Sequence, residues 1–130
     1  MAKPQYLGLS HDITTDALAI DMARSVASKK GQGITVLDLR GLTVITDFFI
    51  VCNGSSPLNL HAIADAVLGD SKKMGIKGVR QEGAEIDGWV LIDLGGVVIH
   101  IFDAENREFY ALEKLWVDAP RVPLPADILA

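Results

Sequence analysis

The sequence predicts an α/β protein with a mixed sheet of about five strands flanked by helices. Helical and β-rich patterns alternate along the chain, and two β-rich runs meet at a Gly-Gly pair that indicates a hairpin. Strands that occur both singly between helices and as a hairpin are typical of a mixed sheet. A length of 130 residues suffices for one domain with a single hydrophobic core.

The first helix is expected over about residues 16–30. Its apolar side chains recur at helical spacing: Leu18, Met22 and Val26. Thr14 or Thr15 can cap its start, and Gly31 can end it in the left-handed conformation.

Strands and a second helix follow. Short β-rich runs predict strands over residues 34–39, about 48–52 and about 79–82. Residues 42–45 could extend either of the first two strands. Ser56 as N-cap and Pro57 in the first turn predict a second helix, which Gly75 ends.

The hairpin over residues 89–102 divides into two faces. Both glycines of Gly95-Gly96 can adopt a positive φ, and side chains alternate outward from that turn. One face is aliphatic: Val90, Ile92, Leu94, Val97, Ile99 and Ile101. The other, the mixed face, combines aromatic, polar and apolar side chains: Trp89, Leu91, Asp93, Val98, His100 and Phe102. The residues alone leave open whether the mixed face is core or a binding surface.

The chain then continues into a third helix, expected over about residues 105–116 with Asp103 as N-cap. Three side chains are expected on one side of it: Phe109, Leu112 and Trp116. Prolines should keep residues 119–125 extended or disordered.

Composition excludes several classes of function. A net charge of −5 and scattered basic residues argue against a broad grip on nucleic acid, but they suit a basic protein partner. No apolar run is long enough to span a membrane, and no secretory signal follows Met1. The single Cys52, expected to be a buried thiol, suits a reducing cytosol.

Sites for chemistry are weakly indicated. The Gly54-Ser55-Ser56 loop before a helix could hold a phosphate, although a cap and turn explain it better. Asp47 could be an acid catalyst, but we expect it to accept hydrogen bonds from backbone N–H groups at the strand entry. The three histidines do not have metal-ligand spacing: His11, His61 and His100. We expect His61 to be solvated, and we expect neither a metal nor a cofactor.

An ordered set of motifs resembles the ribosomal silencing factor family, also called RsfS or Iojap. The motifs are LDLRG (37–41), TDFFIV (46–51), GSS (54–56) with AIAD (62–65), EG (82–83), WVLID (89–93), VIHIF (98–102) and REFYALEKLW (107–116). The resemblance covers residues 13–119. It leaves residues 1–12 as an N-terminal extension and residues 120–130 as a proline-rich tail.

The resemblance implies a fold related to nucleotidyltransferases but without their catalytic carboxylates. It also implies a non-enzymatic cytoplasmic protein that binds protein L fourteen of the large ribosomal subunit. Such a protein blocks joining with the small subunit and represses translation when nutrients are scarce. A bacterial cytosolic member is the expectation.

The resemblance raises the surface interpretation of the mixed face. We assign the anchor role to Trp89, with Leu91, Asp93 and His100 beside it. Leu94 and Tyr110 are further candidates, although the position of Leu94 is ambiguous: alternation places it in the core and the hairpin tip places it in solvent.

Two other functions stay open at this point. One is a degenerate nucleotidyltransferase that uses Gly54, Ser55 and Asp93. The other is a homodimer formed through the hairpin or a sheet edge.

Overall fold

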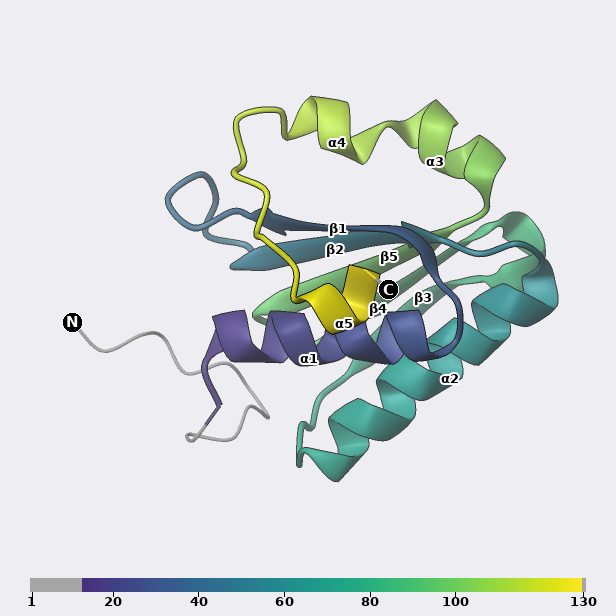
Figure 1. Ribbon diagram of the computed structural model, residues 1–130, viewed down its shortest axis with the longest axis horizontal. Helices are drawn as coiled ribbons and strands as arrows, with labels where there is room; N and C mark the ends of the chain where they lie inside the picture. Colours follow the sequence, from purple (N-terminus) through teal and green to yellow (C-terminus); the bar gives the residue numbers. More distant parts are fainter. Residues whose placement is uncertain (1–12, 130) are drawn as a thin grey trace.

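The computed structural model describes residues 13–129 and contains a five-stranded mixed sheet with helices on both faces (Figure 1). Its elements are α1 (Thr15–Ser28), β1 (Gln32–Asp38), β2 (Phe48–Asn53), α2 (Pro57–Lys73), β3 (Arg80–Ala84), the 3₁₀ helix η1 (Glu85–Asp87), β4 (Trp89–Asp93), β5 (Val97–Phe102), α3 (Ala104–Tyr110), α4 (Leu112–Leu115) and α5 (Ala126–Leu129). The N-terminal extension, residues 1–12, lies outside the described residues. None of the described helices is long and apolar enough to cross a membrane.

The strand order is β1-β2-β5-β4-β3, with β5 at the centre. β5 runs parallel to β2 and antiparallel to β4, so the predicted mixed sheet is confirmed. The pairing of Trp89 with Phe102 and of Leu91 with His100 also confirms the register counted from the hairpin turn.

The hairpin turn uses only one of its two glycines for a positive φ. Gly95 has φ 90°, while Gly96 has no positive φ, and the Leu94 N–H donates to the Val97 carbonyl over 2.9 Å. A glycine with positive φ at the first central position matches a type II′ turn, whose twist suits the strands that it joins.

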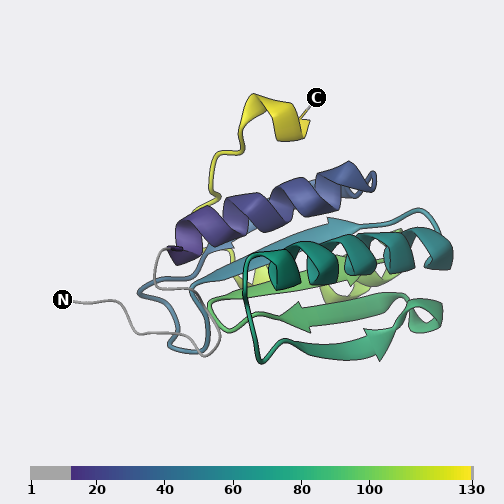
Figure 2. The same ribbon diagram turned by 90° about the horizontal axis from the view of Figure 1, so that it is seen from below.

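Helices α1 and α2 cover one face of the sheet (Figure 2). The whole aliphatic face of the hairpin is buried against them, together with Leu18, Met22 and Val26 of α1. This side is the main core, as the alternation pattern predicted.

The ends of the two long helices follow the sequence signals with one exception. Ser56 accepts a hydrogen bond from the Asn59 N–H over 3.0 Å, and Gly75 has φ 81° just after α2, as predicted. At the end of α1, the left-handed residue is Lys30 (φ 63°) rather than Gly31. Gly31 is needed for space instead, because a Cβ there would lie 2.3 Å from a methyl group of Val26.

The segment between β1 and β2 joins neither strand. It forms a loop in which Thr43 accepts a hydrogen bond from the Ile45 N–H over 3.2 Å. Its apolar side chains are exposed: Leu42, Val44 and Ile45.

The opposite face of the sheet lies beneath α3 and α4. The single helix predicted over residues 105–116 is wrong, because Ala111 adopts a left-handed conformation (φ 48°, ψ 47°) and breaks it in two. Leu112 and Trp116 pack on a second apolar cluster, while Phe109, predicted on the same side, is exposed. The cluster consists of Leu37, Leu39, Val51, Phe102 and Ala119.

The proline-rich segment is extended, as one of the two expected forms, and it packs on the domain. Its backbone pairs with the edge of β1: Asp38 N–H donates to the Pro120 carbonyl and Val122 N–H to the Val36 carbonyl, both over 2.9 Å. Helix α5 then places Ile128 in the main core. The β1 edge of the sheet is therefore covered by the tail.

Candidate protein-docking surface

Helices α3 and α4 cover only part of the mixed face. These helices lie over β1, β2 and β5 and leave β4 and β3 open on this side (Figures 1 and 2). Accordingly Trp89, Leu91 and Asp93 of β4 are half-buried, whereas every residue of β5 is buried. The expectation that His100 lies at the surface beside Trp89 is therefore wrong, because only 4% of the residue is exposed.

Trp89 stands at the centre of an aromatic cluster built from β4, β5 and α3. Its ring centroid lies 4.4 Å from that of Tyr110 and 4.9 Å from that of Phe102. Tyr110 is 45% exposed, so the structure places two of the predicted site residues side by side at the boundary between core and solvent. Aromatic side chains in such positions are typical anchors of protein interfaces.

His100 lies beneath Trp89 and is neutral. The indole N–H of Trp89 donates to Nδ1 of His100 over 3.3 Å, so the imidazole proton must sit on Nε2. Nε2 is buried and has no hydrogen-bond partner within residues 13–129. Burial lowers the pKa of His100 from 6.5 to about 4, because desolvation disfavours its charged form.

Asp93 has a structural role at the hairpin. Its Oδ1 accepts a hydrogen bond from the Gly95 N–H over 2.8 Å, and its Oδ2 pairs with Arg80 over 3.1 Å. These contacts hold the turn and join β3 to β4. A half-buried carboxylate with two partners is a weaker docking candidate than the aromatic residues nearby.

Leu94 belongs to the core and Leu91 to the surface. Leu94 is 2% exposed and packs with the aliphatic face, so alternation and not tip position decides its place. Leu91 and Trp89 instead line a hollow of about 170 Å³ beside Glu82 and Gly83. This hollow could accept an apolar side chain of a partner. We define the docking face as Trp89, Leu91 and Tyr110.

The Gly54-Ser55-Ser56 loop acts as a cap and turn, as predicted. The Gly54 N–H donates to the Phe102 carbonyl over 2.9 Å, and the Ser55 N–H donates to the Asn59 side chain over 2.9 Å. Ser56 caps α2. The backbone donors of Gly54 and Ser55 are therefore already occupied.

The other titratable residues considered as sites have structural roles or are buried. Asp47 accepts a hydrogen bond from the Thr15 hydroxyl over 2.6 Å, so the expected bonds from backbone N–H groups are wrong. His61, largely exposed as expected, contacts Glu85 at 3.0 Å, and this hydrogen bond raises the pKa of His61. Burial raises the pKa of Cys52 to about 12, which leaves its thiol unreactive.

Among residues 13–129, no three His, Cys, Asp or Glu side chains lie close enough to hold a metal ion. His11 lies outside the described residues.

Two features of this surface were not predicted from the sequence. Phe49 packs edge-on against His100 with ring centroids 4.6 Å apart, and only its alternation within β2 could have placed it on this face. Arg107 makes side-chain contacts with α4 nearby in the chain and with two strands, at Asn53 and Thr35, that are 54 and 72 residues away. No local pattern indicates contacts of that kind.

Comparisons with known proteins agree on one family. The family model described as "Ribosomal silencing factor during starvation" matches residues 12–129. The ribosomal silencing factor RsfS of Halalkalibacterium halodurans is 44% identical over 100 residues, which cover 77% of this chain and 86% of that protein.

More distant proteins extend the comparison. A mouse protein named mitochondrial assembly of ribosomal large subunit protein 1 is 34% identical over 101 residues, which cover 75% of this chain and 44% of that protein. Among solved structures, a Chromobacterium violaceum protein superposes with a TM-score of 0.77 at 32% identity, covering 80% of this chain and 87% of that one.

Proposed function

The chain belongs to the ribosomal silencing factor family, and from that premise we propose that its docking face binds protein L fourteen of the large ribosomal subunit. Bound there, the protein blocks joining with the small subunit and represses translation when nutrients are scarce. It acts by occupying a surface and performs no catalysis. We place this activity in the bacterial cytoplasm.

The observation that carries the proposal is the position of Trp89. Its ring is half-buried, bounded by Tyr110 and Phe102, and open to solvent beside the hollow that Leu91 lines. A rigid aromatic side chain next to a small hollow offers apolar area at little cost in conformational entropy. Interfaces concentrate their binding energy in such anchors.

Charge supports a basic protein partner. The chain carries a net charge of −5, and the acidic side chain of Glu82 lines the hollow beside Trp89 and Leu91. Opposite charges at the rim of an interface mainly speed association and fix orientation. We therefore expect binding to large subunits to weaken as ionic strength rises.

The test compares Trp89→Ala with Leu58→Ala. Leu58 is an exposed apolar residue of α2, away from the mixed face, and serves as the matched control. We expect Trp89→Ala to weaken binding by about 2 kcal/mol or more in cosedimentation with purified large subunits. The same variant should restore subunit joining in an assay with purified small and large subunits, while Leu58→Ala behaves as the wild type.

Tyr110→Ala guards against an effect through folding. Because Trp89 also packs over buried residues, its removal could disturb the sheet, whereas Tyr110 is nearly half exposed. Wild-type binding by both variants, each folded by circular dichroism, would contradict the assignment of the docking face. Normal subunit joining in the presence of wild-type protein would contradict the proposed activity.

The two alternatives have different standing. A nucleotide-binding enzyme loses its support at the 54–56 loop, whose backbone donors at Gly54 and Ser55 are occupied. Titration with nucleotide and Mg²⁺ in a calorimeter checks this, and we expect no heat of binding.

A homodimer through the exposed strand β3 is supported by the open edge of that strand, since the other sheet edge is covered by the tail. Sedimentation velocity at several concentrations tests it.

A further inference from the structure

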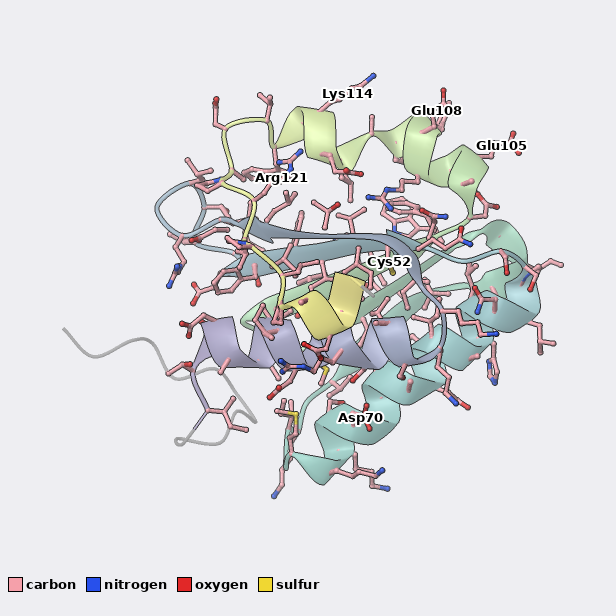
Figure 3. All side chains as sticks on the ribbon, in the orientation of Figure 1. Cys52, Asp70, Glu105, Glu108, Lys114 and Arg121 are labelled. Atoms are coloured by element: carbon pink, nitrogen blue, oxygen red, sulfur yellow. The ribbon has the colours of Figure 1, made fainter. Side chains whose placement is uncertain are left out.

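Helices α3 and α4 are held on the sheet by unusually little apolar burial. Neither of these fully described helices contains a buried residue, although Leu112 and Trp116 are partly buried at and beyond α4. Their outer surface carries charged side chains that point away from the sheet, with Glu105, Glu108 and Lys114 labelled in Figure 3. These few apolar contacts leave room for polar contacts to help set the position of the two helices.

Arg107 of α3 supplies polar contacts to three other elements. Its guanidinium donates to Asn53 of β2 over 2.9 Å, to Thr35 of β1 over 3.3 Å and to Glu113 of α4 over 2.9 Å. Only 16% of its side chain is exposed. Such a planar group with several donors orients its surroundings more strictly than a lysine could.

The chain beside Arg107 is adapted to this contact. Gly33 of β1 lies against the guanidinium, since a Cβ there would be 2.6 Å from its Nη1. On the other side, the N–H of Ala111 donates to the Arg107 carbonyl over 3.0 Å. The left-handed Ala111 is unfavourable for a residue with a side chain, so it persists only where neighbours hold it. Arg107 spans that break through its carbonyl and its bond to Glu113.

Tyr110 follows Arg107 by three residues on α3 and is the helix's contribution to the docking face. Its ring packs on Trp89. The other described ring contacts of Trp89 are with Phe102 and His100, and both of these residues belong to the sheet. The position of α3 therefore determines whether Tyr110 covers the outer side of the Trp89 ring.

We propose that Arg107 is the positioning residue of the docking face: by tying α3 and α4 to β1 and β2, it holds Tyr110 against Trp89. This inference rests on the proposed function for its consequence, but the positioning itself is a property of the free protein. Arg107 need not touch the ribosomal partner.

The test uses a protein in which Trp89 is the only tryptophan. The chain has two tryptophans, and Trp116→Phe removes the other while keeping an aromatic ring against Phe49. In this background we compare Arg107→Gln with Arg24→Gln. Arg24 lies on α1, on the far side of the sheet, and its loss changes the net charge equally.

Two measurements read out the two steps. Acrylamide quenching of Trp89 fluorescence in the free protein reports the cover that Tyr110 provides, and cosedimentation reports binding to large subunits. We expect Arg107→Gln to make Trp89 more accessible to quencher and to weaken binding by about tenfold. Arg24→Gln should change neither quantity. Quenching is measured well below the unfolding transition, so a loss of global stability alone does not alter it.

Other outcomes separate the inference from the proposed function. Unchanged quenching in Arg107→Gln would overturn the positioning role, even if binding fell, because Arg107 would then act by direct contact. If the parent protein fails to bind large subunits, the proposed function fails while the quenching comparison still decides the role of Arg107. If Arg107→Gln does not fold, Glu113→Ala carries the test, because it removes the acceptor of the Arg107 bond across the break at Ala111 and leaves the bonds to β1 and β2 in place. It should raise quenching in the same direction but less.

Discussion

The indole N–H of Trp89 and Nδ1 of His100 are hydrogen-bonded over 3.3 Å, which links a half-buried anchor to a buried neutral imidazole. The bond orients the Trp89 ring, because an indole has one donor and the partner is fixed within β5. It also fixes the imidazole tautomer. The docking face and the interior of the sheet are therefore coupled through one polar contact.

The burial of His100 predicts an acid-sensitive fold. The pKa of His100 is about 4 in the folded protein against 6.5 as its ordinary value, so the unfolded chain binds more protons between these pH values. The free energy of unfolding should fall as pH drops through this window, by up to about 3 kcal/mol from His100 alone. Urea unfolding as a function of pH measures it.

Two histidine variants isolate the contribution. His100→Gln keeps a hydrogen-bonding side chain but removes the titration, so its stability should depend less on pH in this window. The raised pKa of His61 has the opposite sign: its contribution is present at low pH and is lost as pH rises through the folded-state pKa. His61→Gln should therefore leave the acid loss in place, and equal flattening in both variants would contradict the assignment to His100.

The two leucines near the hairpin end should separate stability from binding. Leu94→Ala removes a buried side chain and should lower the free energy of unfolding by about 2–4 kcal/mol. Leu91→Ala, at a half-buried position beside Trp89, should cost about 1 kcal/mol or less but weaken large-subunit binding. Urea unfolding and cosedimentation distinguish them. A stable Leu94→Ala that fails to bind would return Leu94 to the docking face.

Two glycine substitutions should change stability in opposite directions. Gly83 has φ 85°, and a Cβ there would lie 2.2 Å from the Trp89 carbonyl oxygen, so Gly83→Ala must displace β3 from β4. We expect a loss of more than about 1 kcal/mol. Gly69 lies within α2 with nothing near its missing Cβ, so Gly69→Ala should gain about 0.5–1 kcal/mol. Thermal unfolding of both variants checks the signs.

The C-terminal helix should contribute to stability mainly through one side chain. Ile128→Ala removes a buried contact with the main core and should lower the free energy of unfolding by about 2 kcal/mol. Asp127→Asn removes an exposed ion pair with Arg24 and should have a much smaller effect. Limited proteolysis offers a second readout, since loosening of α5 should expose the segment before it. Equal effects of the two variants would mean that the ion pair holds the tail.

Local signals made several elements predictable. The Gly95-Gly96 turn and the alternation of side chains were enough to give the hairpin register and the aliphatic core face. The start and end of α2 followed from Ser56, Pro57 and Gly75, because caps depend on neighbouring residues only. The pattern of strands and helices was enough to predict a mixed sheet, but the order of its strands was not predicted.

Features that depend on distant contacts could not be predicted. His100 is buried because residues from other elements, among them Phe49 of β2, pack against its ring, and nothing near His100 in the sequence encodes that. The break at Ala111 places a non-glycine residue in a conformation that local propensity disfavours. Its neighbours include Arg107, whose side-chain partners on β1 and β2 lie far away in the sequence.

The central position of β5 has a consequence for how the protein folds. Without β5 the sheet consists of two separate strand pairs, β1 with β2 and β3 with β4. β5 pairs locally with β4 through the hairpin, whereas its parallel pairing with β2 joins residues far apart in sequence. Such non-local pairing slows folding and leaves strand edges open in the interim. The pairing of β2 with the strand that carries His100 is thus the contact that joins the two halves of the sheet.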